Sequence, residues 1–484
     1  MIDFDCLLCH HGKCSKACGL LEPHKILRNL YFDNKDVAEN RLSGPLPCIN
    51  CDARCEEVCP EHVRIKDIMT SLKQEEREKV ELDYDRLKTD FCGIPLENPF
   101  LLSSSVVASN YETCSRAFDM GWAGVAFKTV CLMDIIEASP RFSAVRGDNH
   151  RIIGFKNIEQ LSDYELKENI ETFKRLKKNY PNKFLMVSIM GRNEEEWAYL
   201  TDVMNEAGVD ALELNFSCPN MTAENTGSDV GQIPELVERY TRVVKERSRI
   251  PFIAKLTPNV THIEESADAA IRGGADGVAA INTIKSLIEV EVDPTNETFH
   301  ASIGGYSGKA VKPIALRFIA ELGKDENLKG RHISAMGGIE TWKDALEFIA
   351  LGAGTVQVTT AVMQFGYRLI DELKDGTVLY MMRNNIASIG DLCYTALDNV
   401  VPVEELDRSY LIYPRFIREK CVGCERCYVS CMDGGHQAIR FVDGHPQLDP
   451  KRCVGCHLCV LVCPKEAIVS SEIRVPKKDI RTHG

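Results

Sequence analysis

The chain carries two groups of cysteines at metal-ligand spacing, one near each end. The C-terminal group consists of two matched runs, with two, two and three residues between successive cysteines, and Pro464 follows the second run. This spacing is typical of bacterial proteins with two [4Fe–4S] clusters, in which each run supplies three ligands to one cluster and one to the other. The expected ligand sets are Cys421, Cys424, Cys427 with Cys463, and Cys453, Cys456, Cys459 with Cys431. A pair of zinc sites is the weaker alternative, because zinc usually binds two C-x₂-C pairs.

The N-terminal group is less regular, and Pro60 follows it. Its intervals are not those of a zinc finger, and eight thiols can saturate two further [4Fe–4S] clusters, with zinc as the alternative. Since eight cysteines already suffice, we expect His10, His11 and His62 to be solvated. The expected N-terminal ligands are Cys6, Cys9, Cys14, Cys18, Cys48, Cys51, Cys55 and Cys59.

Four clusters in one chain indicate electron transfer. Iron–sulfur clusters pass single electrons, so the rest of the chain should hold a group that converts them to two-electron chemistry, and a flavin is the natural converter. In a cytoplasmic chain these cysteines should not form disulfides, because that compartment reduces them, so their clustered spacing points to metal.

Composition excludes several classes of protein. The 484 residues have a net charge of −13, which disfavours nucleic acid as a partner because phosphate backbones are repelled. No apolar run approaches the ~18 residues needed to cross a membrane, and Met1–Asp5 does not resemble a secretion signal. We therefore expect a cytoplasmic location and no membrane partner.

Composition also divides the chain into four expected domains or linkers. These are an iron–sulfur domain over 1–65, a charged helical linker over 66–90, a strand–helix domain over 91–400, and a ferredoxin-like α+β domain with two [4Fe–4S] clusters over 401–484, whose basic tail is expected to fray.

Eight β-rich runs alternate with amphipathic stretches in the middle domain, a pattern that predicts a parallel sheet covered by helices. Eight units over roughly 300 residues favour a closed (β/α)₈ TIM barrel over an open doubly wound sheet. No G-x-G-x-x-G follows these runs, so we expect neither an NAD(P) nor an FAD site in this chain. The predicted strands are Phe100–Ser105, Gly124–Val130, Phe184–Met190, Ala211–Ser217, Phe252–Thr257, Gly277–Thr283, His332–Met336 and Thr355–Thr360. The predicted helices include Glu194–Ala207, Ile233–Arg249, His262–Gly273 and Thr341–Leu351.

The polar residues at the ends of these runs are candidates for the site, because barrel enzymes work at the C-terminal ends of their strands. Lys128 and Lys255 interrupt apolar runs, where a lysine needs an anionic or carbonyl partner such as a flavin, unless it snorkels to solvent. Asn215, Asn282 and Thr283 suit a heterocycle with imide-like edges, and capping of the next helix is the equal alternative.

Glycine-rich segments follow later strands. Gly337 and Gly338 in "MGGIE" and the segment "VTTAV" (358–362) follow the last two, where many barrels bind phosphate, and 303–313 is a further glycine-rich loop of this kind.

Cys218, in "LELNFSCPN", stands apart from both cysteine groups. It follows the fourth predicted strand and opens a polar loop, which places it at the expected pocket. A thiol there can act as a general acid or base toward a substrate stacked on a flavin. The alternative is a small buried hydrophobe beside a proline.

These segments together resemble the dihydropyrimidine dehydrogenase family. "ALELNFSCPN", "AKLTPNVT", "GGYSGKAVKPIALR" and "MGGIE", followed by "CVGCERCYVSCMDGGHQAI", resemble its FMN barrel and C-terminal ferredoxin domain over roughly 88–470. The related dihydroorotate dehydrogenases share the barrel and an SCPN-type cysteine, but their G-L-P-N stretch is not found here. The N-terminal group resembles the cluster domain of the same family and of glutamate synthase small subunits.

The resemblance implies that Cys218 protonates C5 of a pyrimidine while FMN delivers hydride to C6. It implies substrate contacts at Asn157, Glu159, Leu161, Asn215, Ser217, Asn282 and Thr283. It implies FMN contacts at Ser104, Lys128, Thr129, Lys255, Gly305, Gly337, Gly338, Thr359 and Thr360. For the N-terminal clusters it implies that Cys6, Cys9, Cys14 and Cys59 form one set and that Cys18 and Cys55 belong to the other, to which we add Cys48 and Cys51.

Two departures from the family bear on function. Asn220 stands where dihydropyrimidine enzymes often carry histidine, and dihydroorotate dehydrogenases commonly share this asparagine. The FAD and NADPH domains of long family members are missing here, so electrons should arrive from a separate NAD(P)H flavoprotein subunit or a ferredoxin.

We expect a homodimer or hetero-oligomer that reduces the 5,6 double bond of uracil or thymine. The alternatives are dihydroorotate or another activated C=C substrate, and an electron-relay subunit of a larger complex.

Overall fold

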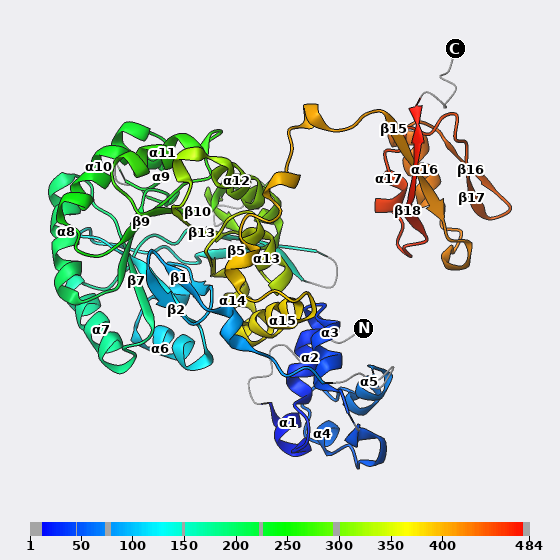
Figure 1. The fold of residues 1–484 in the computed structure, drawn as a ribbon, viewed down its shortest axis with the longest axis horizontal. Helices are drawn as coiled ribbons and strands as arrows, with labels where there is room; N and C mark the ends of the chain where they lie inside the picture. Colours follow the sequence, from blue (N-terminus) through cyan, green and yellow to red (C-terminus); the bar gives the residue numbers. More distant parts are fainter. Residues whose placement is uncertain are drawn as a thin grey trace. The chain divides into compact units, whose positions relative to one another are not determined.

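The computed structural model describes residues 12–44, 46–72, 79–147, 151–221, 226–293 and 301–477. The chain forms two compact units, Met1–Asn399 and Val400–Gly484, and each is described by itself (Figure 1). No helix in the described part is long and apolar enough to cross a bilayer.

The centre of the first unit is a closed barrel of eight parallel strands, so the predicted (β/α)₈ architecture is confirmed. In chain order the strands are β3 (Phe100–Leu102), β4 (Gly124–Val130), β7 (Phe184–Ile189), β8 (Ala211–Asn215), β9 (Phe252–Lys255), β10 (Gly277–Ala280), β13 (His332–Met336) and β14 (Thr355–Val358). Each lies within one of the eight predicted runs.

Helices surround the strands on the outside of the barrel (Figure 1). They are α6 (Tyr111–Met120), α7 (Leu166–Asn179), α8 (Glu194–Ala207), α9 (Ser228–Gly231), α10 (Pro234–Arg247), α11 (Ile263–Arg272), α12 (Lys312–Lys324), α13 (Trp342–Ala350), α14 (Thr360–Phe365) and α15 (Leu369–Arg383). The four predicted helices correspond to α8, α10, α11 and α13.

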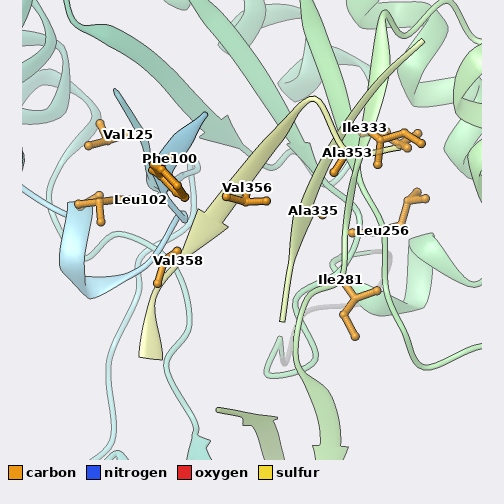
Figure 2. Close-up of a cluster of buried hydrophobic side chains, with 14 of the residues drawn as sticks. Phe100, Leu102, Val125, Leu256, Ile281, Ile333, Ala335, Ala353, Val356 and Val358 are labelled. Atoms are coloured by element: carbon orange, nitrogen blue, oxygen red, sulfur yellow. The ribbon is translucent and has the colours of Figure 1, made fainter. Parts of the chain in front are cut away.

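Strands in this barrel are apolar on both faces, because one face meets the helices and the other fills the interior. Phe100 and Leu102 of β3 pack in the core beneath the helices, whereas Leu101 between them packs in the barrel interior. Figure 2 shows Phe100 and Leu102 beside Val125, Val356 and Val358 from the two neighbouring strands.

A hairpin closes the N-terminal end of the barrel. Its strands are β1 (Thr89–Phe91) and β2 (Ile94–Leu96), and Phe91 and Leu96 pack against interior residues of the barrel strands. The expected helical linker over 66–90 is helical only in part: α5 spans Ile65–Leu72 and a single 3₁₀ turn, η3, spans Tyr84–Leu87, whereas β1 already begins at Thr89. Residues 73–78 lie outside the described part.

An antiparallel sheet of four strands, which the sequence did not predict, joins segments distant in the chain. Its order is β11 (Ile284–Ser286), β12 (Gly304–Ser307), β6 (Ile152–Asn157) and β5 (Phe142–Arg146). The expected phosphate loop over 303–313 is therefore wrong as a loop: it contains β12, the 3₁₀ turn η6 (Lys309–Val311) and the start of α12. In the sheet, Gly305 pairs with Asn157, so β12 meets the end of β6 that carries the predicted substrate contacts.

The N-terminal helices pack against the barrel through buried charges. These helices are α1 (Lys13–Cys18), α2 (Pro23–Tyr31), α3 (Lys35–Arg41) and α4 (Arg54–Glu57). Arg28 of α2 donates to both carboxylate oxygens of Glu372 on α15, at 2.7 and 3.0 Å, and both side chains are 3% exposed. Asp375, one turn further along α15, accepts from Arg41 and Tyr84.

The second unit has the α+β pattern expected of the C-terminal domain. Strand β15 (Tyr410–Phe416) pairs with β18 (Ile468–Pro476), and β16 (Ile439–Val442) pairs with β17 (His445–Leu448). Two helices, α16 (Arg426–Gly434) and α17 (Leu458–Leu461), each begin within a cysteine run.

Replacing Arg28 with Ala should loosen the N-terminal helices, because it leaves the buried Glu372 carboxylate without its partner. Loss of one member of a buried ion pair costs about 3–5 kcal/mol. Amide hydrogen exchange should therefore accelerate in α2 and α15. Removing the exposed Arg247, which pairs with Asp202, is the control and should leave exchange in these helices unchanged. Unchanged exchange in Arg28→Ala would show that the pair does not anchor α2.

Candidate active site and cluster sites

One cavity of about 1110 Å³, counting the solvent at its mouth, lies at the C-terminal ends of the barrel strands. A concave site lined by a few convergent polar side chains is the usual form of a cofactor or substrate pocket. Of the 17 predicted substrate, cofactor and catalytic residues, 14 line it; Leu161, Ser217 and Gly305 do not. Among the lining residues that the sequence did not predict are Ser103, Phe142, Asn220, Tyr306, Glu340 and Gln357.

Lys255, the last residue of β9, is buried at 2% exposure and does not snorkel. Its Nζ donates to Ser104 at 2.9 Å, to Ser103 at 3.3 Å and to the fully buried Glu213 at 3.2 Å. Ser104 also donates to Glu213, at 2.7 Å. This ion pair lies inside the barrel, and the sequence reasoning missed Glu213 although it is a carboxylate within an apolar strand.

Lys128 of β4 is also buried, at 5% exposure. Its Nζ donates to Glu159 at 2.7 Å and approaches Glu137 at 3.5 Å. Arg141 completes the cluster, 2.9 Å from the second oxygen of Glu159. Glu159, which sequence alone would make a solvated loop charge, is therefore a paired carboxylate at the cavity wall, with a side chain that is only 11% exposed.

The side chains of Asn215 and Asn282 bond to strand β4 and to the loops that follow β8 and β10, and they do not cap helices. Asn215 donates to Thr129 at 2.8 Å, and its oxygen accepts from the backbone N–H groups of Ser217 and Cys218, both at 3.1 Å. Asn282 donates to the Ser217 hydroxyl at 2.8 Å, and its oxygen accepts from the Thr283 N–H. Ser217 is thus a fully buried link between two cavity-lining amides, not a lining residue itself.

Cys218 lies just beyond β8, at 6% exposure, and lines the cavity. Burial raises the pKa of its thiol to about 11, and the backbone N–H of Asn220 and the two lysines partly oppose this shift. The thiol is therefore protonated at neutral pH and can serve as an acid. Cys218 belongs to a small apolar cluster with Cys131, Leu161 and Met190, so Leu161 supports the site through this packing.

Asn220 connects the Cys218 loop to the predicted substrate segment. Its amide nitrogen donates to the Asn157 side chain at 3.2 Å and to the Glu159 carbonyl at 2.8 Å. Its own oxygen is buried without a hydrogen-bond partner among the described residues, and Asn220 lines the cavity. Asparagine at this position therefore positions Asn157 and Glu159.

The glycines at the cavity are required by packing as well as by ligand approach. Gly337 and Gly338 have φ values of 126° and 80°, which favour glycine, and a Cβ at Gly338 would lie 2.8 Å from the backbone nitrogen of Lys312. A Cβ at Gly305 would lie 2.1 Å from the Thr283 hydroxyl, so this glycine lets β12 close against Thr283. Thr359 and Thr360 line the cavity, at the start of α14.

The residues present fit a flavin ring and its phosphate. An isoalloxazine has an imide edge with carbonyl acceptors and one N–H donor. Lys255 is a buried donor in the cavity wall, and the buried Gln357 side-chain oxygen, in the same wall, is an acceptor without a hydrogen-bond partner among the described residues. Backbone N–H groups at Gly337, Gly338 and Thr360 would suit the phosphate.

In the second unit, the cysteines divide between two cavities in the predicted sets. Cys421, Cys424, Cys427 and Cys463 line one cavity. Cys431, Cys453, Cys456 and Cys459 line the other. In the described part of the chain, no three His, Cys, Asp or Glu side chains meet closely enough to hold a single metal ion. Four thiols around one cavity suit a [4Fe–4S] cube, in which each iron takes one thiolate.

In the N-terminal group, Cys18, Cys48, Cys51 and Cys55 lie within electrostatic reach of one another. Burial raises the pKa of Cys48 and raises that of Cys55 to about 11, and the Cys18 and Cys51 thiols add to both shifts. These four are one expected ligand set. Of the other set, Cys14 and Cys59 are buried in the same small core, whereas Cys6, Cys9, His10 and His11 lie outside the described residues. His62 is exposed.

Comparison with known proteins agrees with this arrangement. Residues 86–381 match the dihydroorotate dehydrogenase family, and residues 415–470 match the 4Fe-4S dicluster domain. The chain belongs to the dihydroorotate dehydrogenase family. It is an oxidoreductase that acts on CH–CH bonds, and the predicted barrel with a C-terminal ferredoxin domain is confirmed.

Within this dihydroorotate dehydrogenase family, several relatives are similar over most of the chain. The NAD-dependent dihydropyrimidine dehydrogenase subunit PreA of Escherichia coli (strain K12) is 49% identical over 397 residues, 81% of this chain and 97% of the relative. The chloroplastic dihydropyrimidine dehydrogenase (NADP(+)) of Arabidopsis thaliana is 41% identical, over 61% of this chain and 74% of its own. The catalytic subunit of dihydroorotate dehydrogenase B (NAD(+)) from Pyrococcus abyssi is 36% identical, over 64% and 99%.

A solved structure supports the fold. The ligand-free dihydroorotate dehydrogenase of Eimeria tenella superposes with a TM-score of 0.54 at 21% identity, over 66% of this chain and 95% of that one.

Alkylation of Cys218 should be slow at neutral pH and should accelerate as pH rises toward about 11. Only the thiolate reacts, and a thiol whose pKa is about 11 is ionised in roughly 1 molecule in 10,000 at pH 7. The measurement is iodoacetamide labelling of the full chain followed by mass spectrometry of the Cys218 peptide. A half-maximal rate below pH 9 would contradict a raised pKa.

Proposed function

We propose that this chain reduces the 5,6 double bond of uracil or thymine to the dihydropyrimidine, with FMN in the barrel cavity. Electrons would arrive through [4Fe–4S] clusters from a separate donor. The eight N-terminal cysteines would hold two clusters in addition to the C-terminal pair, for four in all.

The observation that carries this proposal is the set of polar side chains around Cys218. Asn157, Glu159, Asn215 and Asn282 line the same cavity as the thiol. A pyrimidine dione presents two N–H donors and two carbonyl acceptors at its edges. Amides can both donate and accept, and an ionised carboxylate can only accept, so Glu159 suits a ring N–H.

In the reaction, one hydride and one proton add across the double bond. A bound flavin supplies the exchange between single electrons and a hydride. Cys218 supplies the proton to C5, and the raised pKa keeps that proton in place until the substrate takes it. Asn220 holds Asn157 and Glu159 in position beside the thiol, and Ser217 couples the amides of Asn215 and Asn282.

The names of the relatives support both the substrate class and the partner. Two of them are named for dihydropyrimidines, and the bacterial one is named as a subunit that is NAD-dependent. A separate NAD(P)H-oxidising flavoprotein is therefore our proposed donor.

The direct test is anaerobic reoxidation of the reduced protein. The flavin-loaded chain, reduced by a viologen, should be reoxidised by uracil or thymine with formation of the dihydropyrimidine, followed by flavin absorbance and chromatography. Orotate and simple enoates serve as the comparison substrates. Reoxidation by an enoate but not by uracil would redirect the proposal to another C=C substrate, and no reoxidation by any of them would indicate a relay subunit.

Replacing Cys218 with Ala should leave flavin and cluster absorbance intact but lower uracil turnover by roughly 10²–10⁴-fold, the usual contribution of a general acid. The buried Cys131, which packs in the same apolar cluster but does not line the cavity, is the matched control, and Cys131→Ala should retain most turnover. Near-normal turnover in Cys218→Ala would remove the thiol from the mechanism.

A further inference from the structure

Glu137 is a buried carboxylate at the site that neither the expected contacts nor the proposed reaction uses. Its side chain is 8% exposed, and one oxygen accepts the backbone N–H of Gln160 at 3.0 Å. Its other oxygen has no hydrogen-bond partner among the described residues. Gln160 directly follows Glu159 and lines the cavity. The bond from its N–H to Glu137 therefore helps to fix the segment that carries the predicted substrate contacts Asn157 and Glu159.

Charge balance explains why a second carboxylate is buried here. Lys128 lies 3.5 Å from Glu137 and 2.7 Å from Glu159, and Arg141 lies 3.8 and 2.9 Å from the same two carboxylates. Two cations thus face two anions. With Glu159 alone, Lys128 and Arg141 would share one carboxylate, and the surplus positive charge close to the cavity would favour an anionic ligand.

We propose that Glu137 is a specificity-determining residue, which makes the Lys128–Arg141 cluster neutral and so selects an uncharged pyrimidine over a carboxylated one. This inference rests on the proposed function, because it concerns which pyrimidine that site accepts. Orotate is uracil with a carboxylate at C6, so it would bring a negative charge to a cluster whose positive charges are already balanced. Uracil and thymine are uncharged and would bring no such charge.

The test is equilibrium binding, which does not depend on turnover. Dissociation constants for uracil and orotate are measured on the oxidised, flavin-loaded full chain from the change in flavin absorbance. Glu137→Gln removes one negative charge with little change of shape, and should lower the ratio Kd(orotate)/Kd(uracil) by about tenfold or more. Glu137→Asp keeps the charge and should leave the ratio within about threefold of the wild type.

Two further variants guard against the case in which one variant fails to fold. Arg141→Gln, at a side chain that is 35% exposed, makes the cluster net negative and should raise the ratio. Glu372→Gln removes the same charge from an equally buried pair far along the chain, and should leave the ratio unchanged. A ratio that stays within about twofold in flavin-loaded Glu137→Gln, or that falls in Arg141→Gln, would overturn the inference.

The two proposals fail differently. A wild-type protein that binds uracil without reducing it would overturn the proposed function, whereas the change in Kd ratio would still decide the role of Glu137. A wild-type protein that does not bind uracil would overturn both.

Discussion

A charge buried inside a protein needs a partner of opposite sign, and this requirement organises the barrel cavity. Residues alternate between the two faces of a strand, so Glu213 and Asn215 both point into the barrel while Leu214 between them packs beneath the helices. Lys255 pairs in register with Asn215 on the neighbouring strand. The Lys255 ammonium group therefore lies one layer of side chains closer to the C-terminal end of the barrel than Glu213, at the floor of the cavity. The Ser104 hydroxyl bonds to both side chains. A lysine at this depth is held by its partners and cannot reach solvent.

The barrel could be predicted because each of its strands is a short apolar run buried on both faces. The same reasoning missed the four-stranded sheet for a physical reason. Its segments are half-exposed and only three to six residues long, and β12 pairs with β6, which lies about 150 positions earlier in the chain. Pairing between such distant segments leaves no periodic signal in either one. Because this sheet carries Asn157 and Gly305, part of the site could be predicted only from the family resemblance.

Candidate residues in the site could be predicted where a charged residue interrupts an apolar run, as Lys128 and Lys255 do in their strands. Glu213 breaks its strand in the same way, and the rule that a buried charge needs a partner would have found it beside Lys255. Glu137 gave no such signal, because it lies in an irregular segment after β4 and meets Lys128 only through the fold. Cysteine spacing could suggest the C-terminal ligand sets because the ligands of a cube are mostly local in the chain, and the structure groups these cysteines around two cavities in the same way.

The balance of charge around Cys218 also bears on the reaction cycle. A thiol that has given up its proton becomes a buried thiolate, which must be tolerated until it is protonated again. Lys255 and Lys128 favour the thiolate and Glu137 opposes it, whereas burial dominates and holds the resting thiol neutral. In the proposed reaction hydride and proton add together, so a neutral ring remains neutral as product and a negative charge is left on the sulfur. A cluster already balanced by Glu137 and Glu159 is not disturbed by binding or release of such a ring. It would be disturbed by a carboxylated one, whose charge would lie beside the transient thiolate.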